Sequence, residues 1–330
     1  MPPLAIPQIQ TAVSCIQFAS VSAPEPSERH DENGTAPLSI SSTGRDRAIA
    51  AFIANTLDLD ATRIARLTAF ETNEVYEVDV GERRFIVKAS THDALRAEAW
   101  ACARGAEADC GAPPILGIAT LDARTSAFVM PRIAGAPITA GHSAFREVGS
   151  RLRRLHRTPL PRFGTLAEVA WNDRDEFVLR DVSWLAFLHR ICEDTRRIGV
   201  DAARAAEVAI GARVDAFDAV GIGVLCHGDL KTAHILVDGD RLSGIIDWGD
   251  AVVADPLWDI ARFGHRADPE SLALLLAGYD PTGTLAAELA SRLPLYSALW
   301  MLVDAIVDAR LGHPAEAPLA AALRYLDRVG

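Results

Sequence analysis

The period of the apolar residues changes once along this chain of 330 residues, and that change restricts the fold more than any other feature. Between residues 64 and 130 the apolar residues come in short runs separated by turn residues, which is typical of antiparallel strands. From residue 145 onward they recur at helical spacing, as Phe145, Val148 and Leu152 do. We therefore expect an α+β protein with a sheet-bearing first part and a mainly helical second part.

The first part of this pattern predicts a helix, a sheet and a second helix. A helix over residues 45–59 has its apolar residues on one face, and Thr91 is a suitable N-cap for a helix over 92–108. Alternating apolar runs between turn signals predict an antiparallel five-stranded sheet. Its strands are expected over residues 64–70, 75–80, 84–89, 115–121 and 125–130.

The second part is expected to be a mainly helical lobe with a small β insert. Helices are predicted over residues 175–219 and from residue 256 to the end. Brief strands are predicted over 224–226, 235–237 and 242–246. The predicted domains are a disordered N-terminal arm over residues 1–44, a first lobe over 45–134 and a second lobe over 135–330.

The charge, the apolar runs and the cysteines of the chain restrict the partners and the compartment that we expect. The formal net charge of −11, from 33 basic and 44 acidic residues, leaves no large basic surface and argues against nucleic acid as a partner. A small cationic partner is favoured. No run of 18 apolar residues is present, so no membrane span is expected. The 5 cysteines form no C-x-x-C pair, which argues against a disulfide framework or a thiolate zinc site and favours a reducing cytoplasm.

Lysine is almost absent from the chain. Lys88 and Lys231 are the only two lysines, and the other basic residues among the 33 are arginines. An arginine presents a planar fork of donors, whereas a lysine presents a compact point charge. The two lysines therefore predict two positions where a point charge is needed, with chance retention as the alternative.

Two neighbouring stretches of the sequence carry carboxylate and histidine side chains at spacings that indicate a catalytic site. Residues 226–234 read Cys-His-Gly-Asp-Leu-Lys-Thr-Ala-His, and Ile-Ile-Asp-Trp-Gly follows at 245–249. A phosphoryl-transfer loop needs a carboxylate for the substrate hydroxyl, a metal ligand five residues later and a second carboxylate that reaches Mg²⁺ from the next hairpin. Asp229, His234 and Asp247 meet those needs in order.

On these residues the sequence resembles the aminoglycoside phosphotransferase family, over roughly residues 46–330. The resemblance implies a two-lobed, protein-kinase-like fold with a nucleotide-binding first lobe, and a second lobe with the catalytic loop and substrate-binding helices. It implies ATP or GTP and Mg²⁺ as cofactors. Asp229 would orient and deprotonate an acceptor hydroxyl, and Lys231 would neutralise charge on the transferring phosphoryl group. A lysine merely exposed on a loop is the alternative for Lys231.

The first lobe carries further residues of the family pattern. Lys88 ends a strand, where its charge would meet the α- and β-phosphates, and Glu98 on the following helix would hold it by an ion pair. Residues 70–76 resemble the family's nucleotide-positioning loop, with Thr72 and Asn73 near the β-phosphate. An ordinary polar turn is the alternative for that loop.

The end of the last predicted strand resembles the family's hinge. Met130 would border the adenine, the carbonyl of Pro131 would accept from the adenine amino group, and the N–H of Ile133 would donate to the ring. An ordinary strand end is the alternative.

Three histidines, at positions 156, 227 and 234, have different predicted roles. The family usually has Asn where this chain has His234, although macrolide phosphotransferases of the family also carry His there. Because Mg²⁺ prefers oxygen ligands, His234 either ligates the metal or hydrogen-bonds the catalytic loop. His227 is expected to brace that loop, and Asp259 resembles a supporting motif, whereas Asp255 is also explained as a helix cap. His156 reads as an ordinary packed or solvated helix residue.

The expected function is nucleotide- and Mg²⁺-dependent transfer of a phosphoryl group to a hydroxyl of a small molecule, with an antibiotic such as an aminoglycoside as acceptor. The alternatives are a macrolide kinase, a metabolite kinase for choline, homoserine or a sugar, and a non-catalytic pseudokinase. A protein kinase is not supported, because no Ala-Pro-Glu segment follows residues 247–249. Trp300, Asp304 and Asp308 fall four apart and are candidates to meet an amino sugar, with a packed helix face as the alternative.

Overall fold

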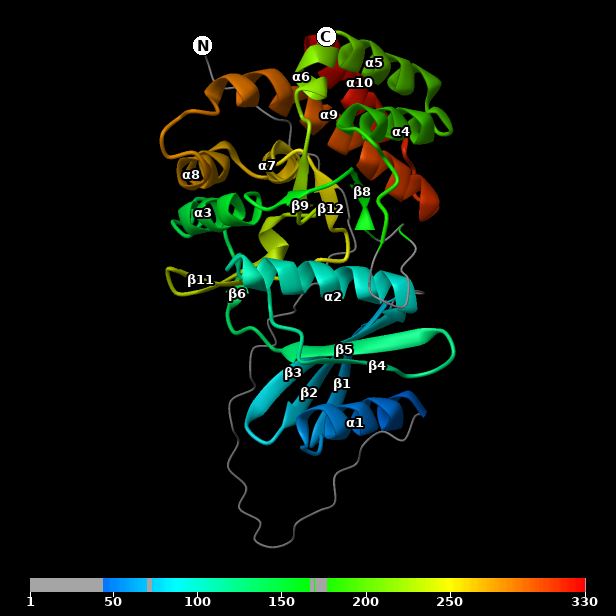
Figure 1. Cartoon of the computed structure of the whole chain (residues 1–330), viewed down its shortest axis with the longest axis vertical. Helices are drawn as coiled ribbons and strands as arrows, with labels where there is room; N and C mark the ends of the chain where they lie inside the picture. Colours follow the sequence, from blue (N-terminus) through cyan, green and yellow to red (C-terminus); the bar gives the residue numbers. More distant parts are fainter. Residues whose placement is uncertain (1–43, 70–72, 167–168, 170–176, 330) are drawn as a thin grey trace, which may run out of the picture. The chain divides into compact units, whose positions relative to one another are not determined.

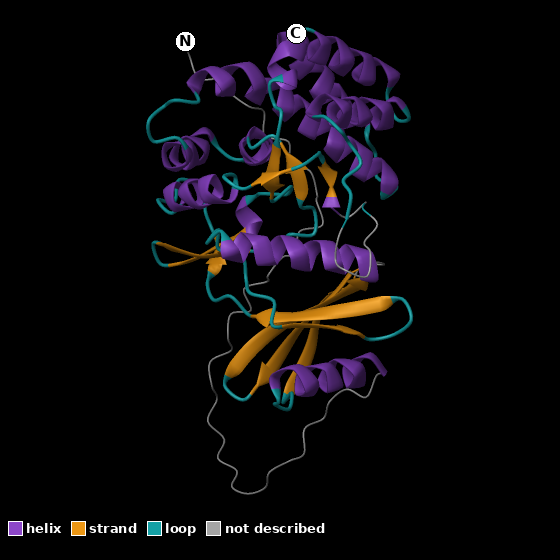
Figure 2. Cartoon of the chain, viewed as in Figure 1, coloured by secondary structure: helices purple, strands orange, loops and turns teal. Residues whose placement is uncertain are grey.

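The computed structural model describes residues 44–69, 73–166, 169 and 177–329 (Figure 1). The predicted arm, except its last residue, lies outside the described residues, and so does Thr72. Within the described residues, strands and helices separate along the chain as the apolar pattern predicts, so the α+β class is confirmed (Figure 2).

An antiparallel five-stranded sheet forms the first part, in the order β1-β2-β3-β5-β4. All five predicted strands are present, the helix predicted before the first strand is present as α1, and the helix predicted after the third strand is present as α2. The bounds are α1 Gly44–Leu57, β1 Arg63–Ala69, β2 Asn73–Val80, β3 Arg83–Thr91, α2 His92–Glu107, β4 Gly117–Thr120 and β5 Thr125–Pro131.

The two faces of this sheet are covered by different helices. Ala127 and Val129 of β5 pack with the buried residues of α1, whereas Phe128, between them, packs with Leu95 and Ala99 of α2. Successive side chains of a strand point to opposite faces, and this period of two determines which helix each residue meets. Lys88 lies opposite Phe128 in the β3–β5 pairing and therefore faces α2.

α2 also belongs to the core of the helical part. Ala97, Ala101 and Cys102 lie in the same buried cluster as residues of the later helices. A Cβ added to Gly105 would lie 2.8 Å from the ring of Trp248, so helix and ring are in close contact. The predicted lobe boundaries at residues 45–134 and 135–330 remain a prediction.

Helices dominate the second part, as predicted. The helical region expected over residues 175–219 begins at Trp184 in the described residues and consists of three helices. From residue 257 onward four helices run to the end of the described chain, with α9 packed against α7 and α10. The bounds are α3 Phe145–Leu155, α4 Trp184–Arg196, α5 Val200–Gly211, α6 Val214–Asp218, α7 Leu257–Arg266, α8 Pro269–Tyr279, α9 Ala286–Arg310 and α10 Glu316–Val329.

The β insert is larger than expected. The three predicted strands are present as β9, β10 and β11, but four further strands of two or three residues join them in two sheets, β11-β10-β6 and β7-β9-β12-β8. β12 was not predicted because three apolar residues leave no period to read. The bounds are β6 Ala136–Pro137, β7 Pro159–Leu160, β8 Gly164–Thr165, β9 Gly223–Cys226, β10 Ile235–Asp238, β11 Arg241–Ile245 and β12 Val252–Ala254.

Two expectations need correction. Thr91 is at the N-cap position of α2, but its side chain makes no capping hydrogen bond. The absence of an 18-residue apolar run suggested that no helix could span a membrane, yet α9 is long and apolar enough by length and mean hydropathy. Leu295, Leu299 and Leu302 of that helix are fully buried in the core, which gives a second reason for its apolar composition.

Candidate functional site

Lys88 lies between two carboxylates. Its Nζ is 2.7 Å from Oε2 of Glu98 and 3.1 Å from Oδ1 of Asp247, which is 159 residues further along the chain. We call Lys88, Glu98 and Asp247 the lysine cluster. Burial alone lowers the pKa of Lys88, but the two carboxylates outweigh it and raise that pKa, so the ammonium group is charged. The predicted ion pair between Lys88 and Glu98 is therefore present.

Asp247 has a backbone conformation that few residues adopt. It follows β11 with a φ of 65°, in the left-handed region that is uncommon for residues other than glycine. Trp248, its neighbour, is fully buried against α2, and its indole N–H donates to the carbonyl of Ile245 at 2.9 Å. This packing directs Asp247 towards Lys88. Burial alone raises the pKa of Asp247, but Lys88 and then His234 lower it below the usual range.

His234 ends a single 3₁₀ turn, Thr232–His234, directly before β10. Its Nδ1 lies 3.0 Å from the carbonyl oxygen of Asp229 and must carry the proton, because a carbonyl only accepts. Nε2 then has a free lone pair, and it lies 3.3 Å from Oδ2 of Asp247. Burial lowers the pKa of His234 to about 4, so the ring is neutral near pH 7. Nε2 of His234 and Oδ2 of Asp247 are therefore two hydrogen-bond acceptors that face each other.

Asp229 is a buried carboxylate between two cations, whereas Lys88 is a buried cation between two carboxylates. Its Oδ2 is 2.6 Å from Nζ of Lys231, and its Oδ1 accepts from Nε and Nη2 of Arg262 at 3.0 and 2.6 Å. We call Asp229, Lys231 and Arg262 the aspartate cluster. Burial alone raises the pKa of Asp229, but Arg262 and Lys231 hold it below its usual value.

The loop before Asp229 is fixed by buried hydrogen bonds. Asp259 accepts from the backbone N–H groups of His227 and Gly228 at 2.7 and 2.9 Å. His227 donates from Nε2 to the carbonyl of Ile246 at 2.9 Å and accepts from the N–H of Asp229, so it braces the loop as expected. Gly228 has a φ of +81°, and a Cβ there would lie 1.8 Å from a backbone oxygen. Only glycine fits at that position.

Sequence reasoning missed two residues of this site. Arg262 was not singled out, although an arginine between the apolar residues Ile260, Ala261 and Phe263 was a usable signal. His156 was interpreted as a packed or solvated helix residue, and it is packed, but its contact with Asp259 was not foreseen: its Nε2 lies 3.2 Å from Oδ2 of Asp259. A single histidine at a helix end carries no signal for such a contact.

The proposed nucleotide contacts are placed only in part. Met130 lies two residues beyond Phe128 on β5 and packs with the α2-facing cluster, on the same sheet face as Lys88. Pro131 ends β5, and Ile133 follows it, half-buried, with its side chain against Gly244. Asn73 begins β2 and pairs with Ser90. The described residues show no side-chain contact between Lys88 and any of these four.

The late helix that was a candidate for substrate contact faces α7 instead. Trp300 is 6% exposed, and its indole N–H donates to the carbonyl of Trp258 at 3.0 Å. Asp304 is bound by Arg262 and Arg266 at 2.7 and 2.8 Å. Trp300 and Asp304 are thus packed and paired within the helical part, which agrees with the alternative of a packed helix face. Asp308 is half-buried and lies 3.7 Å from His313.

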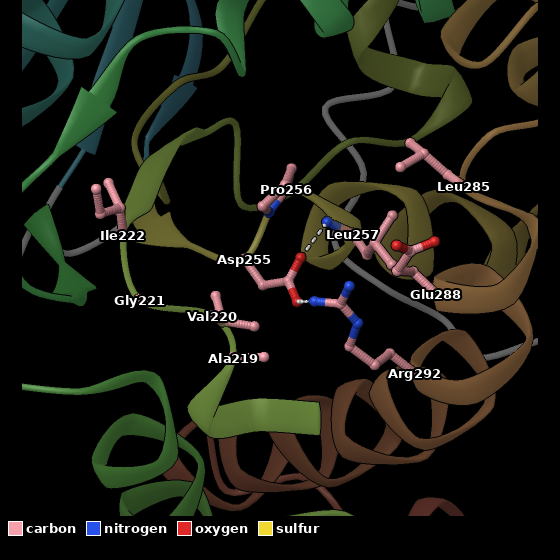
Figure 3. A pocket seen from close by; sticks show the side chains of 10 residues that line it. All are labelled: Ala219, Val220, Gly221, Ile222, Asp255, Pro256, Leu257, Leu285, Glu288 and Arg292. Atoms are coloured by element: carbon pink, nitrogen blue, oxygen red, sulfur yellow. Dashed lines mark hydrogen bonds and ion pairs between the residues drawn. The ribbon is translucent and has the colours of Figure 1, made fainter. Parts of the chain in front are cut away.

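A cavity of about 410 Å³ lies elsewhere, at the end of β9 and β12 that is remote from Asp229 (Figure 3). Asp255 accepts there from the N–H of Leu257 at 2.9 Å, which makes it a cap of α7. Its other oxygen accepts from Arg292 at 2.6 Å, and the two side chains, which both line the cavity, point towards each other (Figure 3). None of the predicted site residues lines this cavity.

Comparisons with known proteins place these features in a family. The family model described as "Phosphotransferase enzyme family" matches residues 63–291. Viomycin phosphotransferase of Streptomyces vinaceus is 27% identical over 197 residues, which cover 57% of this chain and 66% of that protein. Protein YcbJ of Bacillus subtilis (strain 168) is 41% identical over 64 residues, 19% of this chain and 21% of that protein. The chain thus matches less than two thirds of the length of either relative.

Two solved structures share the fold. The ternary complex of a thermostable mutant of aminoglycoside phosphotransferase APH(4)-Ia with AMP-PNP and hygromycin B has a TM-score of 0.65 at 17% identity, and it covers 86% of this chain and 97% of that one. A protein described as a fructosamine-3-kinase from Thermobifida fusca has a TM-score of 0.66 at 20% identity, with coverage of 85% and 98%. At these identities the likeness concerns the kinase-like fold alone.

Proposed function

This chain belongs to the phosphotransferase enzyme family, and from that premise we propose that it transfers the γ-phosphoryl group of ATP or GTP to a hydroxyl of a small molecule. The observation that carries the proposal is the convergence of the lysine cluster with His234 and Asp229. Residues from four separate segments meet there, with Lys88 2.7 Å from Glu98 and Asp247 3.3 Å from His234. Phosphoryl transfer depends mainly on positioning and charge neutralisation, which these groups supply.

Lys88 is the proposed ligand of the nucleotide phosphates. Glu98 fixes its position, and the lysine is about as buried as the glutamate, so neither side chain is free to turn away. Asn73, Met130, Pro131 and Ile133 are proposed to contact the nucleotide, from the family pattern and from the shared sheet face of Lys88 and Met130.

A divalent cation fits between Asp247 and His234. Nε2 of His234 and Oδ2 of Asp247 are both acceptors, and two acceptors 3.3 Å apart repel each other unless a cation lies between them. Mg²⁺ is the proposed cation, although an imidazole nitrogen is a poorer ligand for it than an amide oxygen. When bound, it would neutralise charge on the nucleotide phosphates.

Asp229 is proposed to receive the acceptor hydroxyl, with Lys231 beside the transferring group. The lowered pKa of Asp229 makes it a weak base, so its main contribution is to orient the hydroxyl, and it takes the proton late. This division suits a loose transition state, in which the nucleophile needs little activation before bond formation.

The proposed acceptor is an antibiotic. Viomycin phosphotransferase is a relative, and the complex of the APH(4)-Ia enzyme contains hygromycin B, which support this class over others. The net charge of −11 favours a cationic acceptor over a nucleic-acid partner, and the cysteine pattern favours a reducing cytoplasm. A metabolite kinase is the second candidate, because the fructosamine-3-kinase fold is equally similar.

The test is a nucleotide-consumption assay with a panel of acceptors. Viomycin, hygromycin B, other aminoglycosides, macrolides, choline and a fructosamine are each incubated with the protein, Mg²⁺ and either ATP or GTP, and products are identified by mass. We expect a mass gain of one phosphoryl group on an antibiotic. Binding of nucleotide without turnover on any acceptor would favour the pseudokinase alternative.

A further inference from the structure

The two oxygens of Asp229 are not equivalent. Oδ1 accepts two hydrogen bonds from one guanidinium, at 2.6 and 3.0 Å, and a carboxylate oxygen has two lone pairs. Oδ2 accepts one bond, from Lys231 at 2.6 Å. Oδ1 is therefore saturated, and Oδ2 keeps one lone pair.

Arg262 is itself held on several sides. Its Nη1 donates to Oδ1 of Asp304 on α9 at 2.7 Å, and its guanidinium carbon lies 4.5 Å above the ring of Trp300. Asp304 is fixed in turn by Arg266 at 2.8 Å and by His265 at 3.2 Å. The Arg262 side chain is 8% exposed. Such a planar group, stacked on a ring and bound at both ends, has one orientation available to it.

We propose that Arg262 is a positioning residue for phosphoryl transfer: it occupies Oδ1 of Asp229, fixes the plane of the carboxylate, and leaves Oδ2 as the oxygen that receives the acceptor hydroxyl. Asp304 on α9 completes this support. The inference rests on the proposed function, because it concerns the acceptor of the same reaction. It assigns a role to a residue that lies 33 positions beyond Asp229.

The test begins with Arg262→Lys, which keeps the charge but cannot donate two bonds to Asp229 and one to Asp304 in a planar fork. We expect kcat to fall about 10- to 100-fold, because a small displacement of the reacting hydroxyl has that effect. The KM for the nucleotide should stay within about twofold, since Arg262 contacts no residue of the lysine cluster in the described structure. Arg262→Gln should lower kcat at least as much as Arg262→Lys.

The matched control is Arg292→Lys. Arg292 also binds a buried aspartate, Asp255, at 2.6 Å, but it does so at the remote cavity (Figure 3). Loss of stability alone would affect both variants alike, so thermal unfolding is measured for both. We expect kcat of Arg292→Lys to stay within about twofold of the wild type.

A double mutant determines whether Arg262 acts through Asp229. Adding Arg262→Lys to Asp229→Asn should lower kcat by less than about twofold more, because the oxygen that Arg262 positions no longer serves. Independent, multiplicative losses would overturn the inference, as would wild-type kcat in Arg262→Lys or an equal loss in Arg292→Lys. Absence of turnover by the wild type would instead overturn the proposed function, and the inference with it, which is a different result.

Discussion

The lysine cluster and the aspartate cluster have the same construction with opposite signs. In one, a buried cation lies between two carboxylates, 2.7 and 3.1 Å away. In the other, a buried carboxylate lies between two cations, each with an atom 2.6 Å away. The three residues of the lysine cluster carry one more negative than positive charge, and those of the aspartate cluster one more positive than negative, which Asp304 offsets by its pairing with Arg262.

This difference matches what each cluster is proposed to meet. The extra carboxylate charge at Asp247 would attract the proposed divalent cation and, with it, the nucleotide phosphates. The ammonium group of Lys231 would face the transferring phosphoryl group, while Asp229 would keep one lone pair for the hydroxyl. Buried charges are costly unless paired, so the second carboxylate of the lysine cluster supports the proposal that a cation completes that site, whereas Asp304 already pairs with the second cation of the aspartate cluster.

The largest expected effect is at the centre of the aspartate cluster. Asp229→Asn keeps the shape of the side chain but removes its charge, so kcat should fall at least about 100-fold, with nucleotide affinity within about threefold. Steady-state kinetics and calorimetric titration with a non-hydrolysable nucleotide measure the two quantities. Asp240→Asn, in the exposed turn between β10 and β11, is the control and should behave like the wild type. Unchanged turnover in Asp229→Asn would remove Asp229 from the reaction.

The next effect is at the centre of the lysine cluster. Lys88→Ala removes a charge-assisted contact to the phosphates, so kcat/KM for the nucleotide should fall about 10- to 100-fold, mainly through KM. Lys88→Arg should also lose activity relative to the wild type, because a planar guanidinium does not replace the compact ammonium group between Glu98 and Asp247. Circular dichroism checks that both variants fold. Wild-type turnover in either one would contradict the assignment of Lys88.

A smaller effect is expected for Asp247→Asn, and it distinguishes a role of Asp247 in binding Mg²⁺ from a role in holding Lys88. Asp247→Asn should weaken binding of the nucleotide about 10-fold in the presence of Mg²⁺, because Mg²⁺ depends on few protein oxygens. In the presence of a chelator the same variant should bind nucleotide about as well as the wild type does under that condition. Calorimetric titration under both conditions gives the comparison. Equal weakening with and without Mg²⁺ would show that Asp247 acts through Lys88 alone.

The smallest effect concerns the pH dependence of stability. The pKa of His234 is about 4 in the folded protein and 6.5 in the unfolded chain, so below pH 6.5 the unfolded chain binds a proton that the folded protein does not. Its contribution to stability is therefore present above pH 6.5 and is lost as the pH falls towards 4. Between pH 6.5 and 5 the wild type should lose roughly 1.5 kcal/mol more unfolding free energy than His234→Asn. Denaturant unfolding in metal-free buffer measures this, and parallel curves for the two proteins would contradict it.

The fold was predictable where its signal is local. The five strands of the first sheet follow from apolar runs of four to nine residues, and turns such as Gly81-Glu82 mark their ends. β6, β7 and β8 have two residues each, which is too short for any period to show. They exist because neighbouring strands offer them partners.

The site was predictable only as a set of candidates. Spacing along the catalytic loop identified Asp229, His234 and Asp247, because a loop of fixed length determines which atoms can reach one another. It gave no means to find Arg262, which lies on another helix, or to exclude Trp300 and Asp304, whose spacing on α9 fits a binding face as well as it fits a packed one.

The sequence by itself therefore determined the longer helices and strands, the family resemblance and the charges near the site, since each of these depends on residues close together in the chain. The tertiary structure decided which charge neutralises which. Lys88 meets Asp247 across 159 residues and Asp229 meets Arg262 across 33, and these contacts exist only once the sheet, α2 and α7 are packed. Electrostatic pairing depends on distance in space, and no local pattern encodes that distance.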